Sequence, residues 1–270
     1  MSGYRAYCAF ILSLLPLWAG AFPKADPVPG GVAIIPLASS ATAKPSATYD
    51  GKAVLVAEHD GQWLALIGIA LGTPAGLNFV QINDNSEALL DIFPKQYVEQ
   101  RITLKDNKHV DPNPKDLKRA QADKKQSDKA LATLSDTNPQ LDFIWPHNGP
   151  LSSPFGLQRF FNDQPRAPHS GLDIAAPQGD PIKAPAGGKV ILVGDFFFNG
   201  KTVFIDHGQG LISMFCHMSK IKVSTGQEIK QGDVMGLVGK TGRATGPHIH
   251  WSLSLNNARV NPLLFLPPRP

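Results

Sequence analysis

Two short stretches near the C-terminal end of the chain have the spacing of metal ligands. The segment "HSGLD" places His169 and Asp173 four residues apart, and "HIH" places His248 and His250 two apart. On a β-strand, residues i and i+2 point to the same face, so the two later histidines share one side. A catalytic zinc site uses about three His or carboxylate ligands and leaves one position for water. His169, Asp173 and one of the two later histidines would complete such a set.

The surroundings of both stretches favour one shared ion. Gly171, between His169 and Asp173, indicates a loop whose backbone can fold both side chains toward one centre. Each pair alone is weak evidence, because histidine pairs on strands are usually surface or hydrogen-bonded residues. Their joint presence in one β-rich region, each beside glycines, predicts a metal site.

Three motifs in this region resemble one known family. They are "PHSGLDIAAPQGDPIKAPAGGKV", "GLISMFCHMS" and "GRATGPHIHWSL", in this order within residues 150–265. They resemble the LytM/lysostaphin-like zinc peptidases of family M23, which cut the peptides of peptidoglycan. The resemblance implies one Zn²⁺ per chain, held by His169, Asp173 and His250, and it makes His217 and His248 the catalytic histidines. Which of these two is the base stays open.

The segment "MFCHMS" departs from the family at two positions. Family members commonly carry Tyr where Phe215 stands and a small residue where Cys216 stands, so a hydroxyl group is lost but no metal ligand. A nucleophile pair of Cys216 and His217 is the alternative interpretation. Adjacent residues of a strand point to opposite faces, so we expect the thiol to face away from the site as a small buried group.

Residues 1–21 have the composition of an export signal. Arg5 precedes the apolar run "AYCAFILSLLPLW", and the small residues "AGA" stand before Phe22 at the spacing of a cleavage site. The run is short for a membrane span and contains Pro16. A cleaved signal is the first interpretation and an uncleaved N-terminal anchor the second, and both place the rest of the chain outside the cytoplasm.

Residues 22–112 predict a small antiparallel β domain, regulatory or wall-targeting in role. Asp60-Gly61 separates the apolar runs Lys52–His59 and Gln62–Ala70, which indicates a hairpin because both turn residues tolerate positive φ. The stretches "IIPL" and "LIGIALG" resemble the β domain that precedes the peptidase in Gram-negative members of the family. That resemblance implies a periplasmic protein of a Gram-negative bacterium.

The rest of the chain divides into a helix and a second β domain. Residues 113–140 include "PKDLKRAQADKKQSDKALATLSDTN" at 114–138, which predicts a solvated helix between domains. In residues 141–270, short β-like runs alternate with turns. The predicted fold class is therefore mainly all-β: a C-terminal LytM-like antiparallel β domain, preceded by a small antiparallel β domain and a helical linker.

The composition narrows the classes of partner. The apolar fraction is 42% and the charged fraction 18%, as in ordinary globular proteins, and the net charge is +4. This mild positive charge suits an anionic cell wall or membrane surface. No dense Lys/Arg tract interleaved with aromatic residues is present, so nucleic acid is not an expected partner. A membrane is not expected to be a partner either, beyond the N-terminal anchor.

These features together predict an exported zinc endopeptidase that hydrolyses amide bonds in the stem or cross-link peptides of peptidoglycan. The first substrate is the D-Ala–diaminopimelate cross-link, and glycine-rich bridges are the alternative. A rival from another class is a non-catalytic member that binds the wall or activates an amidase. Such a member should lack part of the site, which is complete here. We also expect that the N-terminal domain or the 114–138 helix can cover the cleft and inhibit the enzyme.

Several further residues carry weaker expectations. The tripeptide "GKT" at 239–241 lacks the upstream glycine of a phosphate-binding loop. His207 is expected to be structural, in a tight turn over residues 206–210. The remaining positions are three expected surface histidines and three polar residues of an expected rim loop: His59, His109, His147, Asn162, Asp163 and Arg166.

Overall fold

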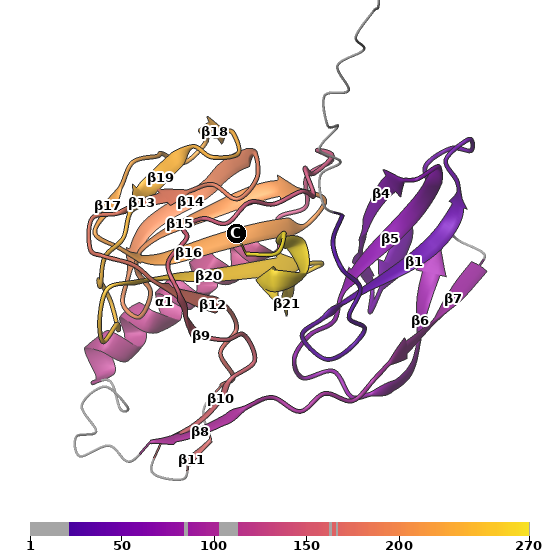
Figure 1. The fold of residues 1–270 in the computed structure, drawn as a ribbon. Coiled ribbons are helices and arrows are strands. Elements are labelled where there is room, and N and C mark those ends of the chain that lie inside the picture. Colours follow the sequence, from indigo (N-terminus) through magenta and orange to yellow (C-terminus); the bar gives the residue numbers. More distant parts are fainter. Residues whose placement is uncertain (1–21, 84–85, 103–112, 162–163, 166, 270) are drawn as a thin grey trace, which may run out of the picture.

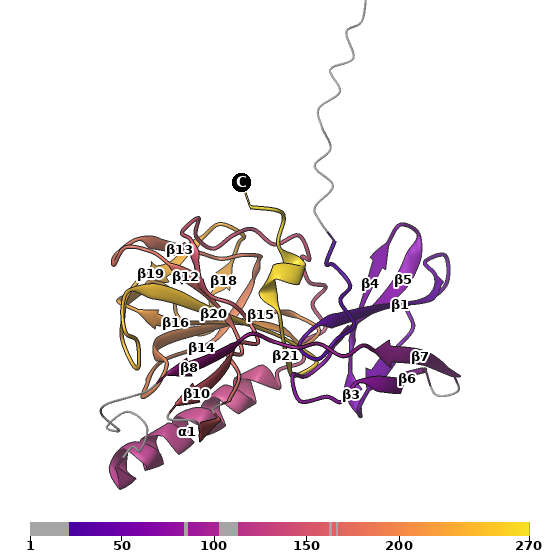
Figure 2. The same ribbon diagram turned by 60° about the horizontal axis from the view of Figure 1, so that its bottom comes forward.

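The computed structural model describes residues 22–83, 86–102, 113–161, 164–165 and 167–269 (Figure 1). Two β-rich parts lie side by side, and one helix lies against the larger part (Figures 1 and 2). The predicted mainly β class is confirmed. Within the described ranges, no helix is both long and apolar enough to cross a membrane. The expected export signal (1–21), His109 and the three rim-loop residues Asn162, Asp163 and Arg166 lie outside them.

The N-terminal part folds as two small sheets. Its strands are β1 (Val32–Ser39), β2 (Ala47–Tyr49), β3 (Lys52–Ala53), β4 (Leu55–His59), β5 (Gln62–Gly68), β6 (Gly76–Ile82) and β7 (Ser86–Ile92). One sheet has the order β1-β5-β4 and the other β3-β2-β6-β7. The predicted hairpin is present between β4 and β5, where Asp60 and Gly61 have φ of 49° and 77°. Two positive φ values match the type I′ turn that such a hairpin prefers.

One large antiparallel sheet forms the centre of the C-terminal part, with the order β18-β14-β15-β16-β20-β12-β9 and β21 paired to β20. A smaller sheet, β13-β19-β17, packs on the same apolar core. Their bounds are β9 (Leu151–Ser153), β12 (Leu172–Ala175), β13 (Pro181–Lys183), β14 (Gly188–Phe196), β15 (Gly200–Gly208), β16 (Leu211–Met218), β17 (Lys220–Ile221), β18 (Glu228–Ile229), β19 (Val234–Leu237), β20 (His248–Leu255) and β21 (Ala258–Val260). A 3-10 helix, η1 (Pro262–Phe265), follows.

Helix α1 (Pro114–Leu131) is shorter than the predicted 114–138 segment and is not a free linker. Its last turn is buried against aromatic and sulfur-containing side chains of the large sheet, as Ala130 shows. Beyond the helix the chain bonds to the sheet instead: the Gln209 N–H donates to the Ser135 carbonyl at 2.9 Å. The end of the helix is therefore packed against the large sheet, which the composition of the segment does not reveal.

One parallel pair departs from the antiparallel pattern. Strand β8 (Glu99–Ile102) leaves the N-terminal part and pairs in parallel with β10 (Gln158–Phe161), which also pairs with β11 (Gln164–Pro165). Figure 1 shows these strands at the lower edge of the molecule. The N-terminal part thus supports the chain segment that leads toward His169.

A side-chain clamp joins the two parts of the molecule. Asn256, in the turn between β20 and β21, accepts the Gly68 N–H at 2.6 Å through Oδ1 and donates through Nδ2 to the Gly68 carbonyl at 3.0 Å. A Cβ at Gly68 would lie 2.6 Å from the Leu255 carbonyl oxygen, so this close approach requires glycine. Apolar residues of both parts, such as Val32 and Leu253, also belong to one continuous core.

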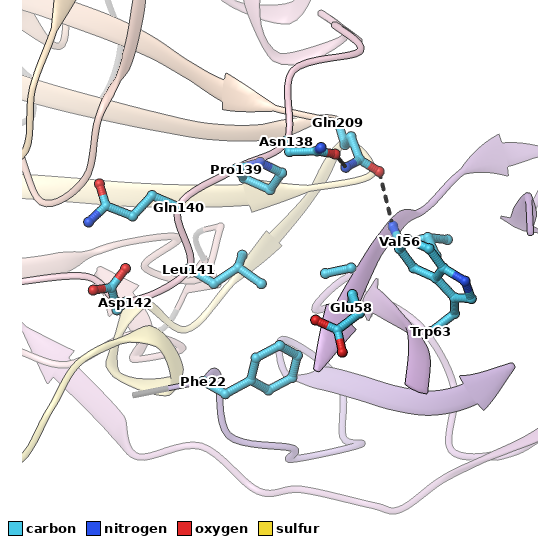
Figure 3. A pocket seen from close by; sticks show the side chains of 11 residues that line it. Phe22, Val56, Glu58, Trp63, Asn138, Pro139, Gln140, Leu141, Asp142 and Gln209 are labelled. Carbon is cyan, nitrogen blue, oxygen red and sulfur yellow. Dashed lines mark hydrogen bonds between the residues drawn. The ribbon is translucent and has the colours of Figure 1, made fainter. Parts of the chain in front are cut away.

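A pocket of about 520 Å³ lies beside this junction (Figure 3). The open edge of β4 forms one wall, and residues 138–142 form the other. Gln209 crosses the gap: its Oε1 accepts the Val56 N–H at 3.1 Å, and its Nε2 donates to Asn138 Oδ1 at 3.2 Å. This side-chain amide thus satisfies a backbone group that a further strand would otherwise bond.

His207 is buried in the core of the C-terminal part. Because an indole N–H can only donate, Trp251 Nε1 donates to Ser213 Oγ at 3.1 Å, and the hydroxyl then donates to His207 Nε2 at 2.9 Å. His207 Nδ1 donates to the Gly187 carbonyl at 2.7 Å. This network uses a neutral imidazole. Burial lowers the pKa of His207 to about 4. A structural role agrees with this burial.

We predict that Asn256→Ala lowers the free energy of unfolding by about 2 to 4 kcal/mol, because two buried backbone groups of Gly68 lose their partner. Asn257→Ala is the matched control: Asn257 is exposed and has the same left-handed backbone, with φ of 63° against 43° at Asn256. Chemical denaturation measures both variants. An equal loss in the two would show that backbone strain, not the clamp, explains the effect.

The His207 network predicts a pH dependence of stability. The unfolded chain binds a proton at His207 below about pH 6.5, while the folded chain does so only near pH 4. Between these values the unfolded state holds more protons, so stability falls as the pH falls, by up to about 3 kcal/mol. Denaturation of wild type and His207→Gln from pH 7 to pH 4.5 should give a shallower slope for the variant. Identical slopes would contradict the assignment.

Candidate active site

Strands β12 and β20 bring the three expected metal ligands together. Asp173 on β12 lies directly opposite His250 on β20. His169 Nε2 is 3.1 Å from Asp173 Oδ1 and 3.0 Å from His250 Nδ1, and the last two atoms are 2.8 Å apart. A Cβ at Gly171 would lie 2.6 Å from His250 Cε1, so the glycine makes room for the cluster. Among the described residues these three form the one group with metal-ligand spacing.

The donor triangle fits a zinc ion. With metal–ligand distances of about 2.0 to 2.1 Å in a tetrahedral site, ligand atoms lie about 3.3 Å apart. The other ring nitrogens are already engaged: His169 Nδ1 donates to the Pro154 carbonyl at 2.8 Å, and His250 Nε2 donates to Ser252 Oγ at 3.0 Å. These bonds are compatible with the tautomers that a metal needs, in which His169 Nε2 and His250 Nδ1 carry the lone pairs.

The electrostatics of the cluster favour the protonation states that a metal needs. Burial raises the pKa of Asp173, but hydrogen bonds and charge interactions with His169 and His250 outweigh it and hold this pKa well below its usual range. Burial lowers the pKa of His250. At neutral pH the set therefore offers an ionised carboxylate and an unprotonated imidazole, the forms that coordinate metals.

His217 and His248 line the same cleft, with ring centres 4.8 Å apart. His217 Nδ1 donates to the Thr241 carbonyl at 2.8 Å, and His248 Nδ1 donates to the Gly246 carbonyl at 2.9 Å. Each ring thus keeps Nε2 for other partners. Burial lowers the pKa of His217 to about 4, so its Nε2 is a proton acceptor at neutral pH.

Thr241 positions His217, although nothing in the "GKT" tripeptide indicated this role. Besides accepting the His217 proton at its carbonyl, Thr241 accepts the Lys201 N–H at 2.9 Å through Oγ1 and donates from Oγ1 to the Met218 carbonyl at 2.8 Å. The loop that carries Thr241 is thereby tied to two neighbouring strands. A hydroxyl residue in a glycine-rich loop is too common for its sequence to signal such a contact.

Regular strand alternation, from which we expected the Cys216 thiol to face away from the site, does not hold here because β16 is irregular at this point. Cys216 pairs directly with His250, and opposed residues of neighbouring strands share a face. A register shift between β15 and β16 and the positive φ of His217, 62°, then re-aim the next side chain toward the cleft.

The predicted character of Cys216 is nevertheless confirmed. The residue is fully buried in an apolar cluster that includes Leu131 of α1 and Phe204 of β15. Burial raises the pKa of its thiol to about 12. A thiol in this state is not a nucleophile at neutral pH, which argues against the Cys216–His217 pair.

Phe215, the other departure from the family pattern, lies in the core. It is fully buried, and its ring stacks on Trp251 with centres 5.7 Å apart. The replacement of the family's tyrosine by Phe215 therefore changes the core side of β16 and not the cleft lining. The described residues that line the cleft do not include Phe215; they are His169, Asp173, Phe198, Asn199, His217, Arg243, Ala244, Thr245, His248 and His250.

None of these lining residues comes from the N-terminal part or from α1. The clamp at Asn256 lies six residues along β20 from His250, about 20 Å at the rise of a strand. The described chain thus supplies no side chain that blocks the cleft, and inhibition by the N-terminal domain stays a prediction.

Two of the expected surface histidines are half-buried and lie outside the cleft. His59 stacks on Phe22 with ring centres 4.0 Å apart. His147 Nε2 lies 3.3 Å from Asp180 Oδ2.

Comparison with known proteins identifies the family. The profile of Peptidase family M23 matches residues 167–262, and that of the M23 N-terminal domain matches residues 25–92. A crystal structure described as a peptidase M23 from Pseudomonas aeruginosa is 47% identical and superposes with a TM-score of 0.76, covering 89% of this chain and 95% of that chain. The chain therefore belongs to peptidase family M23.

Curated relatives match over the C-terminal part. The DD-carboxypeptidase/endopeptidase Mpg of Neisseria meningitidis is 38% identical over 120 residues, 44% of this chain and 28% of the relative. The peptidoglycan DD-endopeptidase ShyA of Vibrio cholerae is 38% identical over 112 residues, 41% of this chain and 26% of the relative. The matched segments thus span little more than a quarter of these relatives.

We predict different effects for the two histidines of β20. His250→Ala should abolish stoichiometric zinc binding, because it removes a ligand atom from the triangle. His248→Ala, on the same strand face, should keep most of the zinc and lose activity. Metal analysis of the purified variants, with activity measured in parallel, makes the comparison. Equal zinc loss in both would contradict this division of roles.

Proposed function

We propose that the protein is a zinc-dependent endopeptidase that hydrolyses peptide cross-links of peptidoglycan in the periplasm of a Gram-negative bacterium. The observation that carries this proposal is the complete site: a triangle of His169, Asp173 and His250 with His217 and His248 beside it in one cleft. The leading substrate is the D-Ala–diaminopimelate bond, in keeping with the DD-endopeptidase names of the relatives.

The metal and the two catalytic histidines have separate roles in the proposed reaction. When bound, zinc supplies a water acidified toward neutral pH and an electrophile for the scissile carbonyl. His217 is the general base: its Nδ1–H is held by Thr241, its Nε2 is an acceptor, and its lowered pKa keeps the ring unprotonated before the reaction. The proton taken at Nε2 is then available for the leaving amine.

His248 faces the substrate from the same strand as the expected ligand His250. Its Nδ1–H bond to Gly246 leaves Nε2 for the substrate, where a ring N–H would stabilise the oxyanion that forms on the carbonyl. Donors of this kind contribute much to acyl-transfer catalysis because they are oriented before the reaction begins.

Two other functions fit less well. A wall-binding or amidase-activating member without activity has no need for a complete ligand set. A glycine-bridge endopeptidase shares all five residues, so the substrate itself must separate it from the leading proposal.

The decisive experiment is digestion of purified peptidoglycan with mass analysis of the products, with and without a zinc chelator. Release of monomeric muropeptides from diaminopimelate-type wall, lost with chelator and restored by zinc, is the expected result. Cleavage confined to glycine-bridged wall would favour the alternative substrate. If no peptide bond is cut, or if chelator changes nothing, the proposed function is wrong.

A further inference from the structure

Helix α1 bonds to the backbone of the β14–β15 hairpin close to its turn, which consists of residues 197–199. Asp123 Oδ2 accepts the Phe197 N–H at 2.7 Å, and Arg119, one helical turn earlier, donates from Nη2 to the Asp195 carbonyl at 2.9 Å. Asp123 is half-buried. A carboxylate that accepts a backbone N–H makes a charge-assisted bond, which is shorter and stronger than a neutral one. The middle of the helix therefore holds the β14–β15 turn through a side chain.

The β14–β15 turn forms part of the active-site cleft. Phe198 and Asn199 belong to the cleft lining. The Asn199 carbonyl also accepts the His217 N–H at 2.8 Å. One short turn thus links a carboxylate of α1 to the backbone of the residue to which we assign the role of general base.

The backbone of His217 depends on such contacts. Its φ of 62° lies in the left-handed region, which residues other than glycine adopt only where the surrounding structure fixes them. The Asn199 carbonyl holds the main chain of His217, and the Thr241 carbonyl holds its ring. A displacement of the β14–β15 turn would release the first of these two contacts.

Helix α1 lies between the two segments that match the family profiles, so its role has to be inferred from its own contacts. Apolar contacts such as those of Ala130 pack its last turn on the large sheet, and Asp123 joins its middle to the β14–β15 turn. We propose that Asp123 is a positioning residue that sets the place of His217 through this turn. The inference rests on the proposed peptidase function and adds a residue to it.

The test compares Asp123→Ala with Asp123→Asn and with Asp128→Ala. Asparagine keeps an oxygen that can accept the Phe197 N–H, whereas alanine removes it. Asp128→Ala is the matched control, because Asp128 is an exposed residue of the same helix whose carboxylate bonds to Lys124, at 2.6 Å, and not to the turn. Alanine has the higher helix propensity at both positions, so propensity does not distinguish the two alanine variants.

Kinetics on a synthetic cross-linked peptide and NMR measurement of amide hydrogen exchange provide the readouts. Asp123→Ala should lower kcat about 10-fold with little change in KM, because a displacement of about 1 Å at a catalytic group can cost about 100-fold. Its zinc content should equal that of wild type, because the His-Asp-His cluster is intact. Amide exchange should become faster at Phe197 and His217. Asp123→Asn and Asp128→Ala should match wild type in each measurement.

Three results would overturn the proposal: a wild-type kcat in Asp123→Ala, an equal loss in Asp123→Asn, or an equal loss in Asp128→Ala. The second would assign the effect to charge, and the third would assign it to the helix as a whole. Failure of wild type to cut either the peptide or purified peptidoglycan would instead reject the proposed function. Amide exchange would still test the contact in that case, and unchanged exchange at His217 in Asp123→Ala would contradict the positioning role.

Discussion

The pairing of β12, β20 and β16 is the constraint on which the site depends. It places Asp173 opposite His250, and it places His250 opposite Cys216. Because side chains alternate along a strand, a slip of one residue would turn His250 into the core and bring its apolar neighbours into the cleft. The buried partners on the other face, above all Trp251 stacked on Phe215, hold this register. The His-Asp-His cluster is thus positioned by the packing of the core.

The loops around the sheet complete the site by backbone contact. The carbonyls of Pro154, Thr241 and Gly246 each accept a ring N–H, and so they orient the histidines without contributing a side chain. Because every residue has a backbone carbonyl, such partners do not depend on residue type and cannot be recognised in the sequence. The same close contacts bring Arg243 to the rim of the cleft.

The N-terminal part contributes in another way. It shares a core with the peptidase part, bonds to it through Asn256, and adds strand β8 beside β10. It is anchored at the end of β20 that is distant from the histidines. In the described residues it supplies no part of the cleft lining, and β8 braces the segment that leads toward His169.

Sequence alone determined the hairpin at Asp60-Gly61 and the β-rich class, because turn chemistry and strand alternation are local properties. The family resemblance predicted the ligand and catalytic histidines, which the structure brings into one cleft. Tertiary structure decided the rest. It packed the last turn of α1 against the large sheet, and it turned His217 into the cleft through a register shift near Cys216. It also placed the Thr241 carbonyl against His217. These outcomes depend on contacts between segments that are distant in the sequence, and local sequence patterns do not predict such contacts.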